Sequence, residues 1–129
     1  MKYFKESEWI YNSDKVDKKL KNALDKVRDI ANVPIIINVA YNDSGHSKNS
    51  YHYKGKAVDF YFKGLTNLEQ FACISAVPEL KGIGYYPWWN NPGWHCDIRE
   101  NNLFWISPKY ENYIYDSKKL LNYLIRGKL

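Results

Sequence analysis

The sequence predicts an α+β domain in which a small, mostly antiparallel sheet is flanked by helices. Helical periodicity is found near both ends of the chain, and short β-branched and aromatic runs of strand length lie between them. The last three of these runs follow one another with no helix in between, which favours antiparallel pairing. With 129 residues and no repeat or linker, the chain is expected to form a single domain over residues 1–129.

The first half of the chain is predicted to contain one helix and two strands. Residues 14–31 carry apolar side chains at helical spacing. Residues 34–41 form a nearly continuous β-branched run, which is typical of a strand buried on both faces. A polar, turn-rich loop is expected over 42–55, and the apolar run 57–62 predicts the second strand.

The second half is predicted to contain two helices and three short strands. Thr66 and Glu69 form a capping box for a helix that continues to about Val77, where Pro78 should end it. The last segment predicts a terminal helix capped by Asp116. The strand-like runs between these helices are GIGYY, WHCDIR and LFWIS, and the turn segment PWWNNPG separates the first two.

Charge and composition exclude several classes of protein. The net charge of +5 comes from scattered basic residues without a nucleic-acid-binding motif, so we expect no nucleic-acid partner. No apolar run approaches the roughly 18 residues of a membrane span, and we expect a monomer that is not an integral membrane protein. The N-terminal residues lack the apolar region of a signal peptide, which favours synthesis in the cytoplasm. Cys73 and Cys96 are expected to be buried thiols rather than a disulfide.

Two of the predicted strands carry charged or ionisable residues that do not contribute to a hydrophobic core. In the run 57–62, alternation places Asp59 among apolar neighbours, where a carboxylate is costly unless it is paired or binds a metal. Gly55 permits a tight turn, so that His52 can fold back over the start of this strand. In WHCDIR the polar face consists of His95, Asp97 and Arg99. Cys96 faces the opposite, apolar side and is therefore not a candidate nucleophile.

His52, Asp59 and His95 together offer two imidazoles and one carboxylate. This is a ligand set of catalytic zinc sites, which leave one position open for water. Zinc lowers the pKa of such a water and polarises a substrate carbonyl. From the residues alone an alternative remains, in which His52 is a solvated loop residue and Asp59 caps a turn or pairs with a lysine.

The motif S-x-H-x-x-G-x-A-x-D over residues 50–59 resembles the signature of the zinc D-alanyl-D-alanine carboxypeptidases and L-alanyl-D-glutamate endopeptidases. GIGYYP followed by WHCDIR resembles the closing segment of one branch of this family, and YFKESEW resembles its opening segment. The resemblance covers about residues 3–106. It implies zinc bound by His52, Asp59 and His95, a peptidoglycan peptide substrate, and the small fold shared with the hedgehog signalling domain.

The chain departs from that family where a general base is usually found. Many relatives carry Glu or Asp three residues before the last ligand histidine, which is Pro92 here, and others carry a histidine where Gly93 stands. The best substitute is Asp97, two residues after His95 and on the same strand face. The alternative role for Asp97 is to accept a hydrogen bond from a ligand imidazole or to pair with Arg99.

A second departure concerns the residues that would contact substrate. Relatives often have an arginine after the first long strand, where this chain has Asn42. We expect Asn42 to supply a hydrogen bond but no charge, which Lys48, Lys54 or Arg99 would supply instead. Ser50 is expected to form a hydrogen bond within the loop and to orient His52. Trp88 and Trp89 lie in a Pro/Asn turn, where either packing or a groove wall that binds sugar or peptide explains them.

These observations predict a zinc-dependent peptidase that hydrolyses peptidoglycan stem peptides at the cell wall or in the periplasm. The missing signal peptide suggests release as a phage endolysin. One alternative is a catalytically degenerate, metal-containing module that binds the cell wall. Another is a small basic nucleic-acid-binding domain, which would leave the two histidines and the aspartate unexplained.

Overall fold

The computed structural model describes residues 1–10 and 12–129, and it confirms the predicted α+β class. The strands are β1 (Ile35–Val39), β2 (Ala57–Phe62), β3 (Gly82–Tyr86), β4 (Gly93–Asp97), β5 (Leu103–Lys109) and β6 (Asn112–Ile114). They form one sheet in the order β1-β2-β4-β3-β5-β6. Neighbouring strands run antiparallel, except for β3 and β5, which are parallel.

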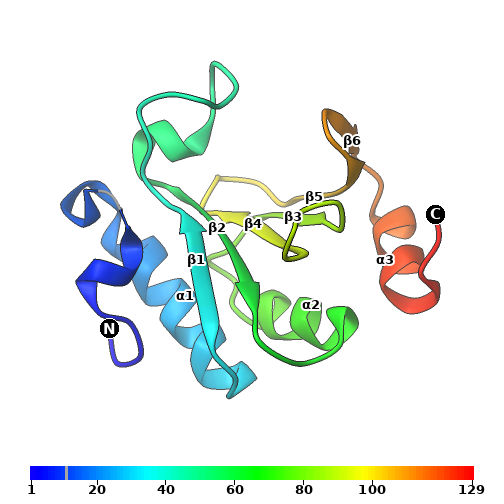
Figure 1. Cartoon of the computed structure of the whole chain (residues 1–129), viewed down its shortest axis with the longest axis horizontal. Coiled ribbons are helices and arrows are strands. Elements are labelled where there is room, and N and C mark those ends of the chain that lie inside the picture. The colour runs from blue at the N-terminus through cyan, green and yellow to red at the C-terminus, as the bar shows by residue number, and fades with distance from the viewer. Residues whose placement is uncertain (11) are drawn as a thin grey trace.

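Three α-helices flank this sheet: α1 (Lys18–Ala31), α2 (Asn67–Ser75) and α3 (Ser117–Arg126). Helices α1 and α2 lie on one side of the sheet, and α3 lies beside β5 (Figure 1). Short 3-10 helices are η1 (Glu6–Trp9), η2 (Ser13–Lys15) and η3 (Tyr51–Lys54). Among the described helices, none has both the length and the apolar character needed to span a bilayer.

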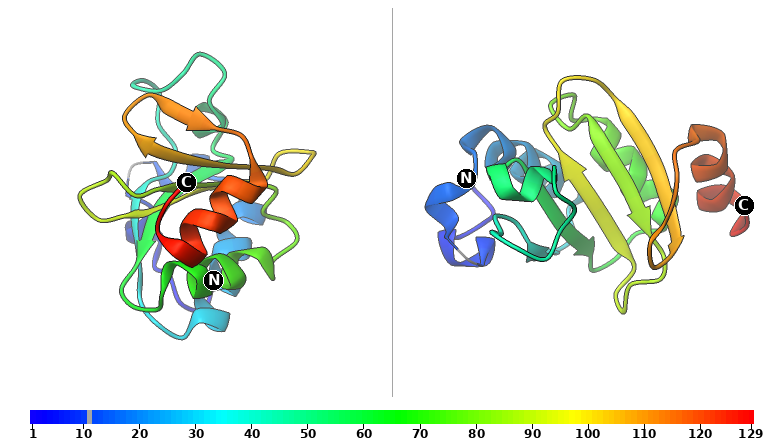
Figure 2. Two further views of the ribbon diagram at one scale, coloured as in Figure 1. Left: turned by 90° about the vertical axis from the view of Figure 1, so that its right-hand side faces the viewer. Right: turned by 90° about the horizontal axis from the view of Figure 1, so that it is seen from above.

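The other side of the sheet carries two raised segments. One is the connection between β1 and β2, which contains η3, and the other is the hairpin of β5 and β6. Figures 1 and 2 show both segments on the side of the sheet away from α1 and α2. The sheet therefore has one face covered by helices and one face flanked by loops.

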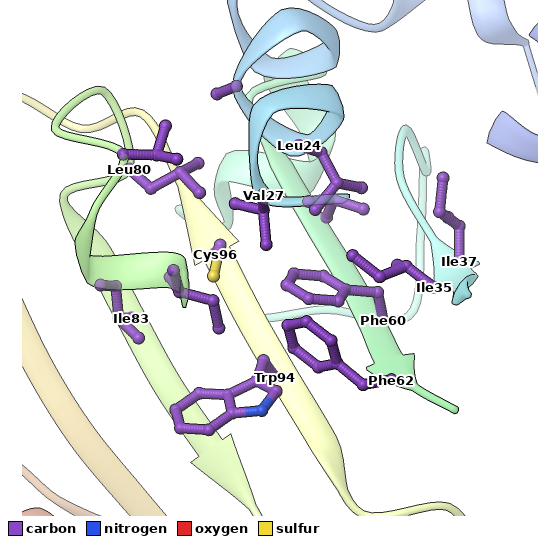
Figure 3. Close-up of a cluster of buried hydrophobic side chains, with 14 of the residues drawn as sticks. Leu24, Val27, Ile35, Ile37, Phe60, Phe62, Leu80, Ile83, Trp94 and Cys96 are labelled. Atoms are coloured by element: carbon purple, nitrogen blue, oxygen red, sulfur yellow. The ribbon is translucent and has the colours of Figure 1, made fainter. Parts of the chain in front are cut away.

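The hydrophobic core lies between the helices and the covered face of the sheet. Strand β2 contributes Phe60 and Phe62 to this core, and β4 contributes Trp94 and Cys96, which is a free thiol. Figure 3 shows these side chains on the same side of the sheet as Leu24 of α1. Because alternate residues of a strand point to opposite faces, the polar residues between them must face the loop-flanked side.

The first long helix begins later than predicted. Helix was expected over 14–31, but α1 starts only after η2 and an extended Val16. Asp17 caps α1 by accepting a hydrogen bond from the Lys19 N–H at 2.8 Å, and its own N–H donates to the Gly55 carbonyl at 2.9 Å. A Cβ on Gly55 would stand 1.9 Å from the backbone of η2. The start of α1 is therefore fixed against the loop that carries η3.

Three other features of the fold also differ from the prediction. The run 34–41 was expected to be buried on both faces, but β1 is an edge strand whose Asn38 is exposed. That prediction was wrong because the helices cover only one face of the sheet, and a β-branched run does not reveal whether the other face is covered. Strand β6 has only three residues, too few for a periodic pattern. Helix α2 ends at Ser75, two residues before Val77.

Candidate metal centre

The loop-flanked face of the sheet brings together residues from four adjacent strands. Asp59 of β2 pairs with His95 of β4, which also pairs with Gly84 of β3. Gly84 pairs in turn with Trp105 of β5. A Cβ on Gly84 would stand 2.2 Å from the indole of Trp105, so only glycine lets this ring lie across β3. The indole reaches His95, with ring centroids 5.3 Å apart.

His52 reaches this face from η3. Its side chain is 97% removed from solvent, so the alternative of a solvated loop residue is wrong. The Ser50 hydroxyl accepts a hydrogen bond from the His52 backbone N–H at 3.2 Å and caps η3, as expected. The imidazole Nδ1 lies 2.7 Å from the carbonyl oxygen of Ala40. Its Nε2 points to Asp59 Oδ1 at 3.1 Å.

His95 approaches the same carboxylate oxygen from the other side. Its Nδ1 lies 3.0 Å from Asp59 Oδ1, and its Nε2 lies 2.7 Å from Asp97 Oδ2. Burial alone would raise the pKa of Asp59, but hydrogen bonds from the two imidazoles outweigh it and hold that pKa well below its usual range. Asp59 is therefore an anion placed between two ring nitrogens.

The donor chemistry of these three residues fits a metal ion. One ligand atom from each residue lies within 4.8 Å of the others. Each ring donates from its other nitrogen, His52 to a carbonyl and His95 to a carboxylate, and neither group can donate in return. The nitrogens that face Asp59 must then carry a second proton or offer a lone pair to a cation. Two imidazole nitrogens and one carboxylate oxygen are zinc ligands.

Asp97 lies beyond the second ring nitrogen of His95 and is fully buried. Its carboxylate accepts hydrogen bonds from Arg99 Nε at 2.7 Å and from Arg99 Nη2 at 2.6 Å. Gly82 leaves room for this pair, since a Cβ there would stand 2.2 Å from Asp97 Oδ1. Both oxygens of the Asp97 carboxylate therefore accept hydrogen bonds, and they lie on the side of the His95 ring that faces away from Asp59.

A cavity of about 990 Å³ opens over the three candidate ligands. Of the residues expected to contact substrate, Ser50, Trp88, Trp89 and Arg99 line it. Asn42 lines a separate, smaller cavity instead, although its side-chain nitrogen lies 3.4 Å from His46 Nε2. Four of the five expected contact residues therefore lie in the cavity wall, but the residue at the position of the missing arginine lies outside it.

Two further residues of the cavity are His46 and Tyr86. The ring of His46 is half-buried and stacks on that of His52, with centroids 4.3 Å apart. Tyr53 holds His46 by accepting a hydrogen bond from its backbone N–H at 2.8 Å. Tyr86 lines the cavity beside Trp89, and their rings stack at 4.4 Å. The only sequence signal for His46 was its place in the same loop as His52.

A small α+β sheet whose open face presents two histidines and one aspartate fits the class of proteins that hold a catalytic zinc ion. A family model described as peptidoglycan L,D-endopeptidase MepK matches residues 11–103 of the chain. The chain belongs to this family, Peptidase_M15_2, whose members are zinc peptidases acting on peptidoglycan. The comparison with curated proteins found no match.

Zinc binding is expected to weaken as the pH falls. Burial acts to lower the pKa of His95, but hydrogen bonds with Asp59 and Asp97 outweigh it and raise this pKa to about 9. At neutral pH the metal-free ring therefore carries a proton that zinc must displace. The apparent affinity should fall about tenfold per pH unit below that pKa. Calorimetry in two buffers of different ionisation enthalpy should show proton release, and a pH-independent affinity would contradict the expectation.

Proposed function

We propose that the protein is a zinc-dependent endopeptidase that cleaves peptidoglycan peptides at a bond between an L- and a D-configured residue. The observation that carries this proposal is the convergence of His52, Asp59 and His95 at the floor of a large open cavity. The description of the matching family supports an endopeptidase rather than the carboxypeptidase that the sequence also allowed. We further propose that it acts as a monomer at the cell wall.

In this proposal the three residues His52, Asp59 and His95 hold the metal, and the residues behind them set their orientation. When bound, zinc supplies Lewis-acid chemistry for activating water and for polarising the scissile carbonyl. Ala40 and Asp97 each accept a hydrogen bond from a ligand ring, and so direct the lone pair of its other nitrogen toward Asp59. Asp97 thus acts as a positioning residue, because its bonds to His95 and Arg99 favour that role over the general base.

Tyr86 is our candidate for stabilising the oxyanion in the absence of the arginine found in relatives. Its hydroxyl accepts a hydrogen bond from Trp105 Nε1–H at 3.0 Å, and no acceptor for its own proton is found among the described residues. Burial raises the pKa of Tyr86, so the proton is retained. Tyr86 of β3 pairs with Gly93 of β4, two residues along from the pair of Gly84 and His95, so its side chain lies on the sheet face that carries His95. It is therefore placed to donate to a substrate oxygen.

Replacing Tyr86 by phenylalanine should lower kcat by about ten- to a hundredfold, since a hydrogen bond to a charged group contributes about 1.5–3 kcal/mol. Zinc content should be unchanged, because the hydroxyl is not one of the metal ligands. The matched control is Tyr85→Phe, which removes a hydroxyl from the neighbouring residue on the core face. Equal kcat values for the two variants would argue against the oxyanion role.

The proposal is tested by incubating the protein with purified muropeptides of defined structure, with zinc and with chelator. Mass spectrometry should show chelator-sensitive cleavage at an L,D bond within the peptide, which His52→Ala abolishes. Release of only the terminal D-alanine would replace the endopeptidase by a carboxypeptidase. Stoichiometric zinc without any cleavage would favour the degenerate module that binds the cell wall.

A further inference from the structure

Phenylalanine is confined to the core of this chain, whereas tryptophan and tyrosine occur both in the core, as Trp9, Tyr85 and Trp94 do, and around the cavity. All five phenylalanines belong to the core or pack against it: Phe4, Phe60, Phe62, Phe71 and Phe104. The aromatic residues around the cavity, apart from histidine, are all tyrosines and tryptophans: Tyr51, Tyr86, Trp88, Trp89, Trp105, Tyr110, Tyr113 and Tyr115. Each of these carries a group that can donate a hydrogen bond beside its apolar ring face.

Five of these residues form one side of the cavity, which we call the aromatic wall: Trp88, Trp89, Tyr110, Tyr113 and Tyr115. The wall is built by the turn between β3 and β4 and by the β5–β6 hairpin with the residue after it. Trp88 and Tyr110 join these two elements, with ring centroids 5.5 Å apart. Trp88 Nε1–H also donates to the hydroxyl of the fully buried Ser107 at 3.2 Å. The wall is therefore held in place although its rings reach solvent.

Exposure of these rings is costly unless a ligand covers them. Trp88 is 41% exposed and Tyr110 is 70% exposed. A contiguous exposed aromatic surface beside a cavity is typical of a binding site. Because every ring of the wall also has a polar group, the surface suits a ligand with one apolar face and a polar rim rather than a purely apolar one.

Charge separates this wall from the rest of the cavity. The cationic side chains that line the cavity are Lys48, which lies in the loop before η3, and Arg99, which packs on the Tyr51 ring at 4.8 Å. The elements of the aromatic wall contribute only Glu111 as a charged cavity residue. Because Arg99 is paired with Asp97, anionic peptide groups are favoured mainly near Lys48, and a neutral group is favoured at the wall.

We propose that the aromatic wall is a subsite for the glycan strand, on which N-acetylated sugar rings stack. A pyranose ring has an apolar C–H face and a rim of hydroxyl and amide groups, and so it matches these side chains. The choice of polymer rests on the proposed function, because stem peptides are attached to N-acetylated glycan. In this arrangement the glycan lies at the wall while the peptide crosses the three metal ligands.

Binding of a peptide-free glycan to the zinc-loaded protein tests the subsite. The probe is a β-1,4-linked N-acetylglucosamine hexamer, titrated by tryptophan fluorescence and by calorimetry. We expect saturable binding that Trp88→Ala and Tyr110→Ala each weaken by about tenfold, as is common for aromatic anchors. The matched control is Leu121→Ala on α3, an apolar residue of similar exposure outside the cavity, which should bind as the unmodified chain does.

Three outcomes would overturn this inference. They are the absence of saturable binding, an affinity unchanged by both wall variants, and concentration-dependent dimerisation that the wall variants abolish. The last would show that a second copy of the chain covers the wall. Since the hexamer contains no peptide bond, a failure here leaves the proposed peptidase intact. A protein that binds the hexamer but cleaves no muropeptide would instead contradict the proposed function alone.

Discussion

Asp59→Asn is expected to reduce peptidoglycan hydrolysis by about a thousandfold or more and to abolish stoichiometric zinc binding. Asparagine has nearly the same shape but no charge, so it cannot act as the anion between His52 and His95. The loss of several kcal/mol of metal-dependent charge stabilisation corresponds to a rate factor of that size. Zinc content measured by mass spectrometry and cleavage of muropeptides should therefore fall together.

The matched control for this substitution is Asp43→Asn. Asp43 is an exposed carboxylate in the connection between β1 and β2, and it does not line the 990 Å³ cavity. Both variants should retain the far-ultraviolet circular dichroism of the unmodified chain. An Asp59→Asn protein that keeps one zinc ion and normal turnover would show that the metal is held elsewhere.

Asp97→Ala is expected to have the second-largest effect and to act on both stability and zinc affinity. Removing the carboxylate leaves Arg99 and the Nε2–H of His95 without their buried acceptor. Breaking a buried ion pair in this way costs about 3–5 kcal/mol of unfolding free energy. Loss of the group that orients a ligand histidine should lower zinc affinity by about ten- to a hundredfold. Chemical denaturation and zinc titration measure the two effects.

Asp97→Asn distinguishes the positioning role from the role of general base. The amide oxygen can still accept a hydrogen bond from His95, but it cannot serve both His95 and the guanidinium as the carboxylate does. If Asp97 positions the ring, saturating zinc should restore most of the turnover. A general base cannot be rescued by zinc, so low turnover at full zinc occupancy would return Asp97 to the base role.

The local elements of the fold could be predicted from the sequence because their signals lie within a few residues of one another. The capping box of Thr66 and Glu69 and the N-cap Asp116 are found as expected. Alternation in the run 57–62 correctly separated the face of Asp59 from the core, and alternation in WHCDIR did the same for His95. These predictions needed only the period of a strand or a helix.

The geometry behind the metal ligands could not be read in this way. The direction of the His52 imidazole depends on the carbonyl of Ala40, which lies 12 residues away in the chain. The direction of the His95 imidazole depends on Asp97, which Arg99 holds in place. The start of α1 likewise depends on the contact of Asp17 with Gly55. Such contacts join segments whose separation is set by packing, and no local pattern encodes it.

The sequence by itself determined the α+β class, the strand faces and the three candidate ligands, because side-chain periodicity and a short motif carry that information. Only the tertiary structure decided that His52 is buried, that Asp97 faces away from Asp59, and that polar aromatic residues gather in one wall. The physical reason is that strand order and register bring together residues that are distant along the chain. Those contacts, rather than the residue types, set which atoms face the metal and the substrate.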